Sequence, residues 1–164
     1  MKLFSTDKSF LNRYFFVPFI LIFFTGLPVH AQTITPVHHL DFGVIAIRDY
    51  NSVARVTILT SGAFTTNSNV YIHENPQIGE YLLQAGLTYA NSFYTVSIIP
   101  STLNLLGAGG VFTVDDFVVS PAVLFTDAAG DDTFFISARL LTQGGGMNYP
   151  DGTYDTTFTV TVNH

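Results

Sequence analysis

The stretch YPDGTYDTTFTVTVNH, from Tyr149 to His164, decides the fold class of this 164-residue chain. Side chains along a strand alternate between its two faces. One face of this stretch carries Tyr154, Thr156, Phe158, Val160 and Val162, and the other carries Asp155, Thr157, Thr159, Thr161 and Asn163. Pro150 and Gly152 favour a turn before it, because proline presets φ and glycine accepts a positive φ. We therefore predict a final strand over residues 154–162, in a central position of its sheet.

Short alternating runs separated by Gly, Pro, Asn, Asp or Ser recur from Gln32 onward, a pattern typical of an all-β sandwich. The strongest run is DTFFISARLLT (Asp132–Thr142), which places Phe134, Ile136, Ala138 and Leu140 on one face and Arg139 on the other. No window of comparable length has helical periodicity. We predict further strands over residues 39–47, 52–60, 69–74, 80–84 and 93–99, and a hairpin that joins 102–106 to 111–120 through the glycines of 107–110.

Residues 1–31 have the parts of a cleavable signal peptide. The positive start is formed by Lys2, Lys8 and Arg13. An apolar run over residues 14–27 follows, which is short for a membrane span, and small residues precede a cleavage point after Ala31. We predict a signal peptide over residues 1–31 and a single β-sandwich domain over residues 32–164. A retained N-terminal membrane anchor is the alternative.

The composition after residue 31 excludes nucleic-acid binding and thiol chemistry. This part of the chain has no lysine, three arginines (Arg48, Arg55 and Arg139) and eleven Asp or Glu residues, a formal charge of −8. Nucleic-acid binding needs clustered Lys and Arg to displace counterions from phosphates, so we exclude it. The chain also has no cysteine, so the domain is held by burial and hydrogen bonds and has no thiol chemistry.

Two motifs lie at the ends of the predicted domain. LDFG opens it, with Leu40, Phe42 and Gly43, and GTYDTTFTVTVNH closes it, with Gly152, Tyr154, Phe158, Val160 and Val162. The middle segment GEYLLQAGLTYANSFYTVSIIP (79–100) adds a short strand, a glycine loop and a Tyr-led strand ending in proline. Together they resemble the bacterial domain of unknown function (DUF) 4402 family. More distantly, they resemble the spore-coat-U-like pilin subunits of archaic chaperone–usher pili.

This resemblance implies an immunoglobulin-like, pilin-type antiparallel β-sandwich that is exported through the Sec route to the periplasm, the cell surface or the medium. In such pilins an extended segment of the next subunit completes the fold by strand addition. Other subunits or a periplasmic chaperone are then the expected partners. We expect the protein to contact the membrane only during export. Only residues 32–39 precede LDFG, and they include Pro36, so pairing of this arm within the chain or with a neighbour stays open.

We expect no metal or cofactor site. His38 and His39 are adjacent, so in a strand they point to opposite faces and do not chelate one ion. His73, Glu74 and His164 show no recognised zinc-ligand spacing.

Several aspartates are alternative calcium ligands, namely Asp115, Asp116, Asp127, Asp131, Asp132, Asp151 and Asp155. No EF-hand pattern is present, so we expect these residues to form turns instead. Strand alternation would point Asp116 inward beside Val114 and Val118, which predicts a β-bulge that turns it outward.

No nucleophile motif or phosphate-cradling loop is present, so we expect the protein not to be an enzyme. The leading hypothesis is an exported structural or adhesive protein, a pilin-like surface or fimbrial subunit, with Thr157, Thr159 and Thr161 facing outward without a role. The rival is a monomeric secreted module that binds a glycan or another ligand through Tyr71, Tyr89 or Phe93 and nearby carboxylates. An exported enzyme ranks third.

Overall fold

The computed structural model describes residues 32–100, 102–106 and 111–164. The predicted signal peptide and the predicted turn at residues 107–110 lie outside these ranges. The described chain consists of antiparallel strands and one 3-10 turn, η1 (Leu87–Tyr89). No helix in these ranges has the length and apolar character needed to cross a membrane. The prediction of an all-β chain is confirmed.

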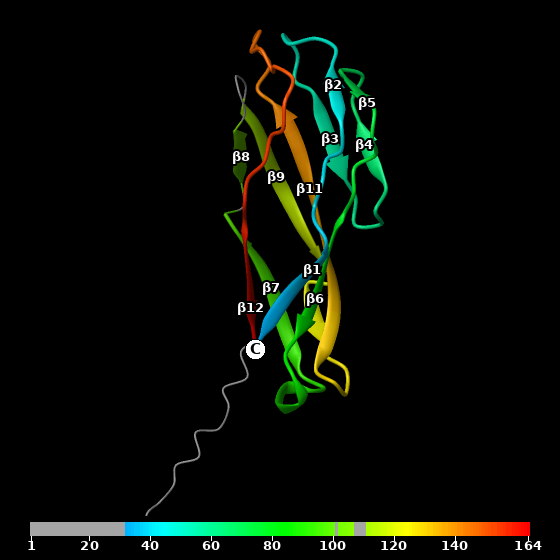
Figure 1. Ribbon diagram of the computed structural model, residues 1–164, viewed down its shortest axis with the longest axis vertical. Coiled ribbons are helices and arrows are strands. Elements are labelled where there is room, and N and C mark those ends of the chain that lie inside the picture. The colour runs from blue at the N-terminus through cyan, green and yellow to red at the C-terminus, as the bar shows by residue number, and fades with distance from the viewer. Residues whose placement is uncertain (1–31, 101, 107–110) are drawn as a thin grey trace, which may run out of the picture.

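The largest sheet is organised around β11 (Asp131–Thr142) (Figure 1). This long strand pairs on one side with β6 and then with β3, and on the other side with β9. The order is β1-β6-β11-β3-β4, with β9 and then β8 on the other side of β11. The bounds are β1 (Thr33–His38), β3 (Arg55–Ile58), β4 (Phe64–Thr66), β6 (Gly79–Gln84), β8 (Leu103–Leu106) and β9 (Val111–Ser120).

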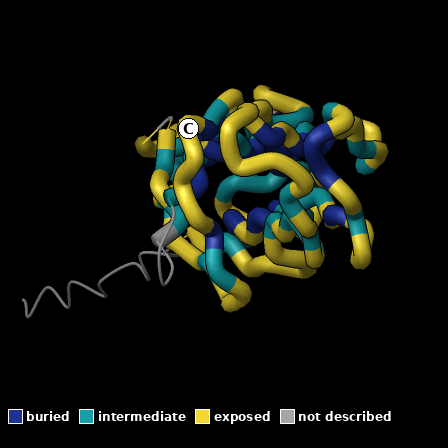
Figure 2. Tube along the Cα trace, turned by 90° about the horizontal axis from the view of Figure 1, so that it is seen from above, coloured by how far each residue is buried: buried dark blue, intermediate teal, exposed yellow. Residues whose placement is uncertain are grey.

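Two small sheets cover one face of the large sheet. One has the order β10-β7-β12 and the other consists of β2 and β5. Their bounds are β2 (Ile45–Ile47), β5 (Val70–Ile72), β7 (Phe93–Ile99), β10 (Val123–Phe125) and β12 (Thr159–Asn163). Seen from above, buried stretches of the chain, in dark blue, occur on both sides of the trace (Figure 2).

Each small sheet packs on its own part of the β11 face. Phe134 and Ile136 of β11 form one buried cluster with Tyr94 of β7 and Leu124 of β10. Further along the same face, Leu140 packs in a second cluster with residues of β3, β5 and β9. Because every second residue from 134 to 140 is buried, the alternation predicted for this strand is confirmed.

The predicted first strand, residues 39–47, is confirmed only over its last three residues, Ile45–Ile47. β1 ends at His38 and β2 begins at Ile45, and between them the chain leaves the large sheet for the covering layer. Gly43 enables this crossing, because its φ is +71° and an added Cβ would overlap the carbonyl oxygen of Glu74. The alternation of apolar residues does not reveal that a run changes sheets.

The prediction for the last strand is also wrong in two respects. β12 begins only at Thr159, and it lies at the edge of its three-stranded sheet rather than in the centre. Residues 149–158 lead into β12 without belonging to a strand, and within them Asp155 forms a single β-bridge. Alternation indicates that one face of a run is buried, but it does not say whether another strand lies beside it.

Candidate functional site

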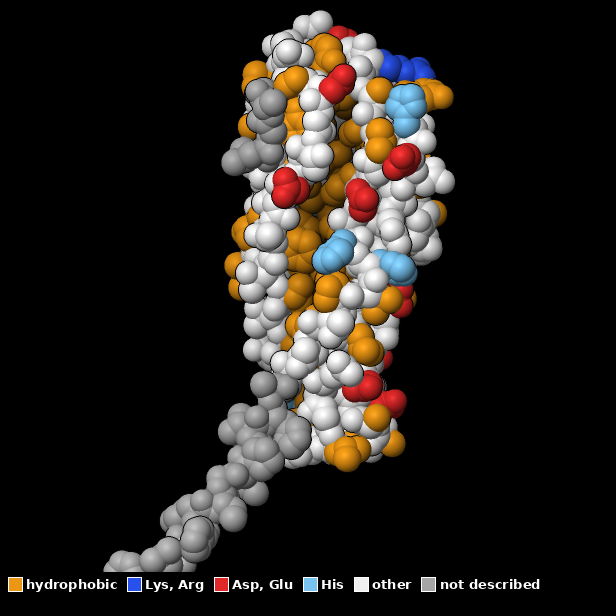
Figure 3. Space-filling view, viewed as in Figure 1, with side chains coloured by type: hydrophobic (Ala, Val, Ile, Leu, Met, Phe, Trp, Pro, Cys, Tyr) orange, Lys and Arg blue, Asp and Glu red, His pale blue; other side chains and the backbone are white. Residues whose placement is uncertain are grey.

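An open groove of about 740 Å³ runs along the described surface (Figure 3). Residues 40–47, which include β2, line one side, and residues 149–156 and 158, in the run that leads into β12, line the other. The groove therefore lies between β2 and the run that leads into β12. Its lining side chains from the large sheet include Leu103, Leu105, Phe112, Val114 and Leu140.

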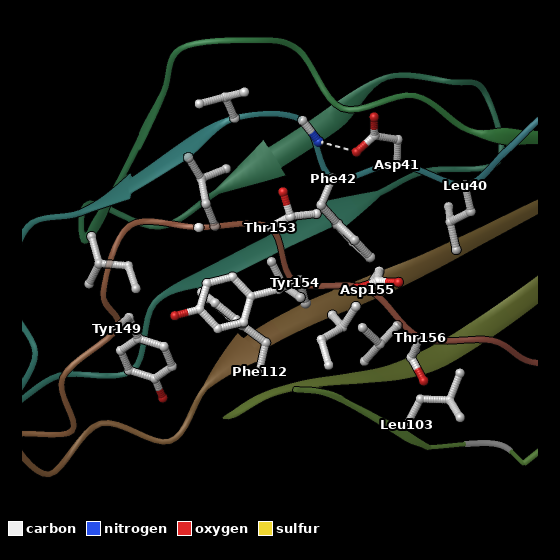
Figure 4. A pocket seen from close by; sticks show the side chains of 18 of the residues that line it. Leu40, Asp41, Phe42, Leu103, Phe112, Tyr149, Thr153, Tyr154, Asp155 and Thr156 are labelled. Carbon is white, nitrogen blue, oxygen red and sulfur yellow. Dashed lines mark hydrogen bonds between the residues drawn. The ribbon is translucent and has the colours of Figure 1, made fainter. Parts of the chain in front are cut away.

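Aromatic rings from β9 and from the 149–158 run form the upper part of the groove. The ring of Phe112 lies 4.7 Å from that of Tyr149 and 4.8 Å from that of Tyr154, in a tilted and an edge-on arrangement respectively. Figure 4 shows residues 40–42 and 153–156 on opposite sides of the groove, with Phe112 below them. Aromatic pairs in these geometries add to the stabilisation that comes from buried area.

Two tyrosine hydroxyls hold the 149–158 side in place. The hydroxyl of Tyr149 accepts a hydrogen bond from the Gln143 backbone N–H (2.8 Å) and donates one to the Val111 carbonyl (3.3 Å). The hydroxyl of Tyr154 donates to the Pro150 carbonyl four residues upstream (2.8 Å). Loss of solvent raises the pKa of the Tyr154 phenol, and Tyr149 and Asp151 nearby raise it further, so it remains a donor at neutral pH.

Replacing Tyr154 with phenylalanine tests this anchoring bond. We expect the free energy of unfolding to fall by about 0.5–1.5 kcal/mol, the usual contribution of one such hydrogen bond. Urea denaturation measures the change, and Tyr71→Phe is the control because the Tyr71 side chain is 51 % exposed. Equal stability of the Tyr154→Phe variant and the wild type would show that the bond does not hold this segment.

A β-bulge in β9 supplies another aromatic ring to the groove. Between the pairs Ser137–Val118 and Arg139–Asp115 the register shifts, and Asp116 has a φ of +55°. The side chain of Asp116 is 62 % exposed, so the predicted outward turn of this residue is confirmed. The bulge brings Phe117 to the inner face, where its ring lies 5.5 Å from that of Phe158.

Backbone and side-chain hydrogen bonds also fix the 40–47 side. Asp41 exchanges two backbone hydrogen bonds with Gln77 (3.0 and 2.7 Å), and its carboxylate accepts one from the Gly43 N–H (2.8 Å). The carbonyl of Val44 accepts from the N–H of His73 (2.8 Å). These bonds tie this side of the groove to residues 73–77. Among the strands that the structure describes, β2 pairs only with β5.

Six of the eight family-motif residues come together at the groove. Its lining includes Leu40, Phe42, Gly43, Gly152, Tyr154 and Phe158. The other two, Val160 and Val162, pack against the cluster beneath the three-stranded sheet. Four further groove residues were not predicted from the sequence: Leu103, Leu105, Phe117 and Tyr149. The β9 alternation identifies Phe112 and Val114 as inward-facing, but it cannot show that the layer above them is open.

The candidate metal ligands lie apart in the structure. His38 approaches Glu80 (3.9 Å), His73 packs on Tyr71, and His164 packs on two tyrosines, Tyr89 and Tyr94. No group of three His, Asp or Glu side chains in the described ranges is arranged to hold a metal ion.

The aspartates mainly serve local structure. Asp115 forms a two-point ion pair with Arg139 (2.8 and 3.1 Å), and Asp116 lies 3.5 Å from the same guanidinium. The carboxylate of Asp132 accepts backbone hydrogen bonds from Phe125 and Thr133. Asp127 accepts from the N–H groups of Ala129 (2.8 Å) and Asp131 (3.0 Å), as turn-forming aspartates do.

The turn at Asp127 predicts a pH effect. Its backbone hydrogen bonds, first that from Asp131, lower the pKa of the Asp127 carboxyl below its ordinary value of 3.8. Such a group stabilises the fold above the unfolded-state pKa, and this contribution is lost as the pH falls through the lower folded-state value. We expect Asp127→Asn to have a lower Tm than wild type at pH 7, and the gap to narrow below pH 4. A gap that stays constant in Tm measurements down to pH 2 would contradict this.

Comparison with known proteins gives one result. The model of the family described as a domain of unknown function, DUF4402, matches residues 33–164. No curated protein and no solved structure matches the chain. The match spans both sides of the groove and all the motif residues named above.

Proposed function

The chain belongs to the DUF4402 family, whose function is open, and we propose that it is an exported, non-catalytic structural subunit of pilin type. In this proposal the groove receives an extended segment of another polypeptide, and the protein acts by strand pairing and burial. It works in the periplasm, at the cell surface or outside the cell. Its partners are other subunits or a chaperone.

The finer fold in this proposal is an immunoglobulin-like sandwich. Two features support it: the two-layer arrangement of antiparallel sheets, and the hydrogen bond from Tyr154 to the carbonyl of Pro150. In immunoglobulin-like folds a tyrosine near the start of a late strand bonds in this way to the backbone a few residues upstream.

The observation that carries the proposal is the open groove itself. β2 and β12 are both edge strands of the small sheets, and the groove lies between β2 and the run that leads into β12. A strand placed there would cover the apolar floor and join the two small sheets into one layer. Strand addition of this kind combines backbone hydrogen bonds with pockets for alternate side chains.

Blocking the groove tests the proposal. Thr153 lines the groove and is exposed, so Thr153→Trp fills the groove without disturbing the buried core. Thr157→Trp is the matched control, because Thr157 is also exposed but is not part of the lining. We expect wild type and Thr157→Trp to bind a labelled extended peptide that alternates valine with threonine in fluorescence anisotropy, and Thr153→Trp to bind it much more weakly. Equal binding by all three proteins would contradict the proposal.

Export is tested separately. The sequence of residues 1–31 supports a cleavable signal peptide. Intact-mass measurement of the protein purified from the cell envelope or the medium is expected to give a chain that begins at Gln32. A chain that retains residues 1–31 would mean that the apolar segment is an anchor.

A second candidate function is glycan binding at an exposed aromatic pair. Phe93 and Phe125, which face each other in the β7–β10 pairing, are 66 % and 51 % exposed, and their ring centroids lie 4.7 Å apart. Of the three aromatics predicted for this role, Tyr71 is exposed beside His73, and Tyr89 is half-buried against His164. Glycan-array binding that is lost in Phe93→Ala would support this function, and no binding to any glycan would remove it.

A further inference from the structure

The rim of the groove carries negative charge on both sides. Asp41 and Glu74 lie on one side and Asp151 and Asp155 on the other, and all four are exposed lining residues. Figure 3 shows acidic side chains flanking the apolar floor. Among the described residues, no Lys, Arg or His is part of the lining.

None of the arginines of the described chain is part of the groove lining. Arg139 is held by Asp115 and Asp116, and Arg48 lies over the ring of Tyr71 at 6.0 Å. Arg55 projects from β3 in the large sheet, where it is exposed. The described ion pairs do not include any of the four rim carboxylates. The rim charge is therefore left for an occupant to neutralise.

The geometry of a strand divides the roles of an occupant's side chains. Every second side chain would enter the groove and meet an apolar, largely aromatic floor. The intervening side chains would point outward, next to the outward side chains of the two flanking segments. Cross-strand neighbours of opposite charge stabilise a sheet, whereas like charges destabilise it.

The N-terminal arm of a second copy of this chain fits these requirements poorly. Its segment TITPVH forms β1, which already pairs with β6 of its own chain. Ile34 and Val37 are three residues apart and fall on opposite faces, so one face offers a single large aliphatic side chain. The arm also has no Lys or Arg, and Pro36 lacks a backbone donor.

We propose that the groove takes a basic amphipathic strand of a different polypeptide, with apolar residues at alternate positions and Lys or Arg between them. This inference rests on the proposed strand-accepting function and adds the chemistry of the partner. Complementary charge gives specificity and a faster association rate more than raw affinity. The attraction is reduced by salt, because the rim is exposed.

Fluorescence anisotropy with labelled peptides and the purified protein tests the inference. Four peptides are compared: one alternating valine with lysine, one with glutamate in place of lysine, one with threonine in place of lysine, and QTITPVHH, the sequence of residues 32–39. We expect the lysine peptide to bind at least about tenfold more tightly than the threonine peptide, a difference of about 1.4 kcal/mol. The glutamate peptide should bind weakest, and the differences should shrink in 1 M salt.

Variants of the rim complete the experiment. The combined variant Asp41→Asn, Glu74→Gln, Asp151→Asn and Asp155→Asn should lose the preference for lysine but still bind the threonine peptide. A control with Asp49→Asn and Asp127→Asn, both outside the lining, should keep the preference. Equal binding of the three alternating peptides, or tighter binding of QTITPVHH, would overturn the inference and leave the strand-accepting function intact. Binding of none of the four would contradict that function itself and this inference with it.

Discussion

Replacing Phe134 with alanine is expected to lower the free energy of unfolding by about 3–5 kcal/mol. The Phe134 side chain is fully buried, and its ring stacks on that of Tyr81 with centroids 5.5 Å apart. It lies at the centre of the cluster that joins the large sheet to β7 and β10. The loss combines the removed apolar contacts with the cavity that remains. It is a large part of the about 5–15 kcal/mol that stabilises a typical domain.

Phe93→Ala is the matched control for this prediction. Phe93 is 66 % exposed, so its removal leaves no internal cavity, and we expect a change below about 1 kcal/mol. Urea denaturation followed by circular dichroism gives both values. Similar losses for the two variants would mean that the two layers do not pack through Phe134 as described.

Gly43→Ala is expected to be the second most damaging single change. At its φ of +71°, the left-handed conformation alone costs a residue with a Cβ about 1–2 kcal/mol. The added Cβ would also overlap the carbonyl oxygen of Glu74 and approach the Asn75 backbone, so the 73–77 segment would have to move. We therefore expect a loss of stability greater than the conformational cost, together with faster amide exchange in residues 40–47.

Gly145→Ala separates the cost of the left-handed conformation from the cost of the steric overlap. Gly145 has a similar φ of +69°, but no atom lies within 4 Å of the position its Cβ would take. This variant should show only the conformational cost of about 1–2 kcal/mol. If Gly43→Ala and Gly145→Ala lower the stability equally in the same denaturation experiment, the close approach of Gly43 to Glu74 is not important.

Strands that are buried on one face were predictable from the sequence. In β3, β7 and β11, every second side chain belongs to the core. The alternation of apolar and polar residues in the sequence therefore matches the alternation of buried and exposed side chains. The β-bulge was predictable for the same reason. Strict alternation along β9 would place the Asp116 carboxylate in the core. A β-bulge shifts the alternation by one residue, so that this side chain points to solvent.

Three strands escaped prediction because their side chains carry little pattern. β4 (Phe64–Thr66) and β10 (Val123–Phe125) have three residues each, and most of these are exposed. β1 is exposed at five of its six positions, and only its pairing with β6 defines it. Edge strands of this kind depend on backbone hydrogen bonds to a neighbour, which side-chain alternation does not report.

The groove could be predicted only in part. The motifs at Leu40–Gly43 and Gly152–Phe158 lie in the two segments that flank the groove, although these segments are more than 100 residues apart in the sequence. Their separation across an open floor depends on where each segment leaves its sheet, at Gly43 on one side and before Thr159 on the other. The points at which the two segments leave their sheets depend on how distant segments pair. The periodicity of a single segment does not predict that pairing.

Hydrogen exchange across the groove tests the central claim most directly. In the purified protein without a peptide, we expect the amides of residues 149–158 to exchange much faster than those of β11, which pairs on both sides. Adding the valine–lysine peptide should slow exchange in residues 149–158 and 40–47 and leave β11 unchanged. Slow exchange in residues 149–158 without any peptide, or no change in either segment when the peptide is in excess, would contradict an open groove that accepts a strand.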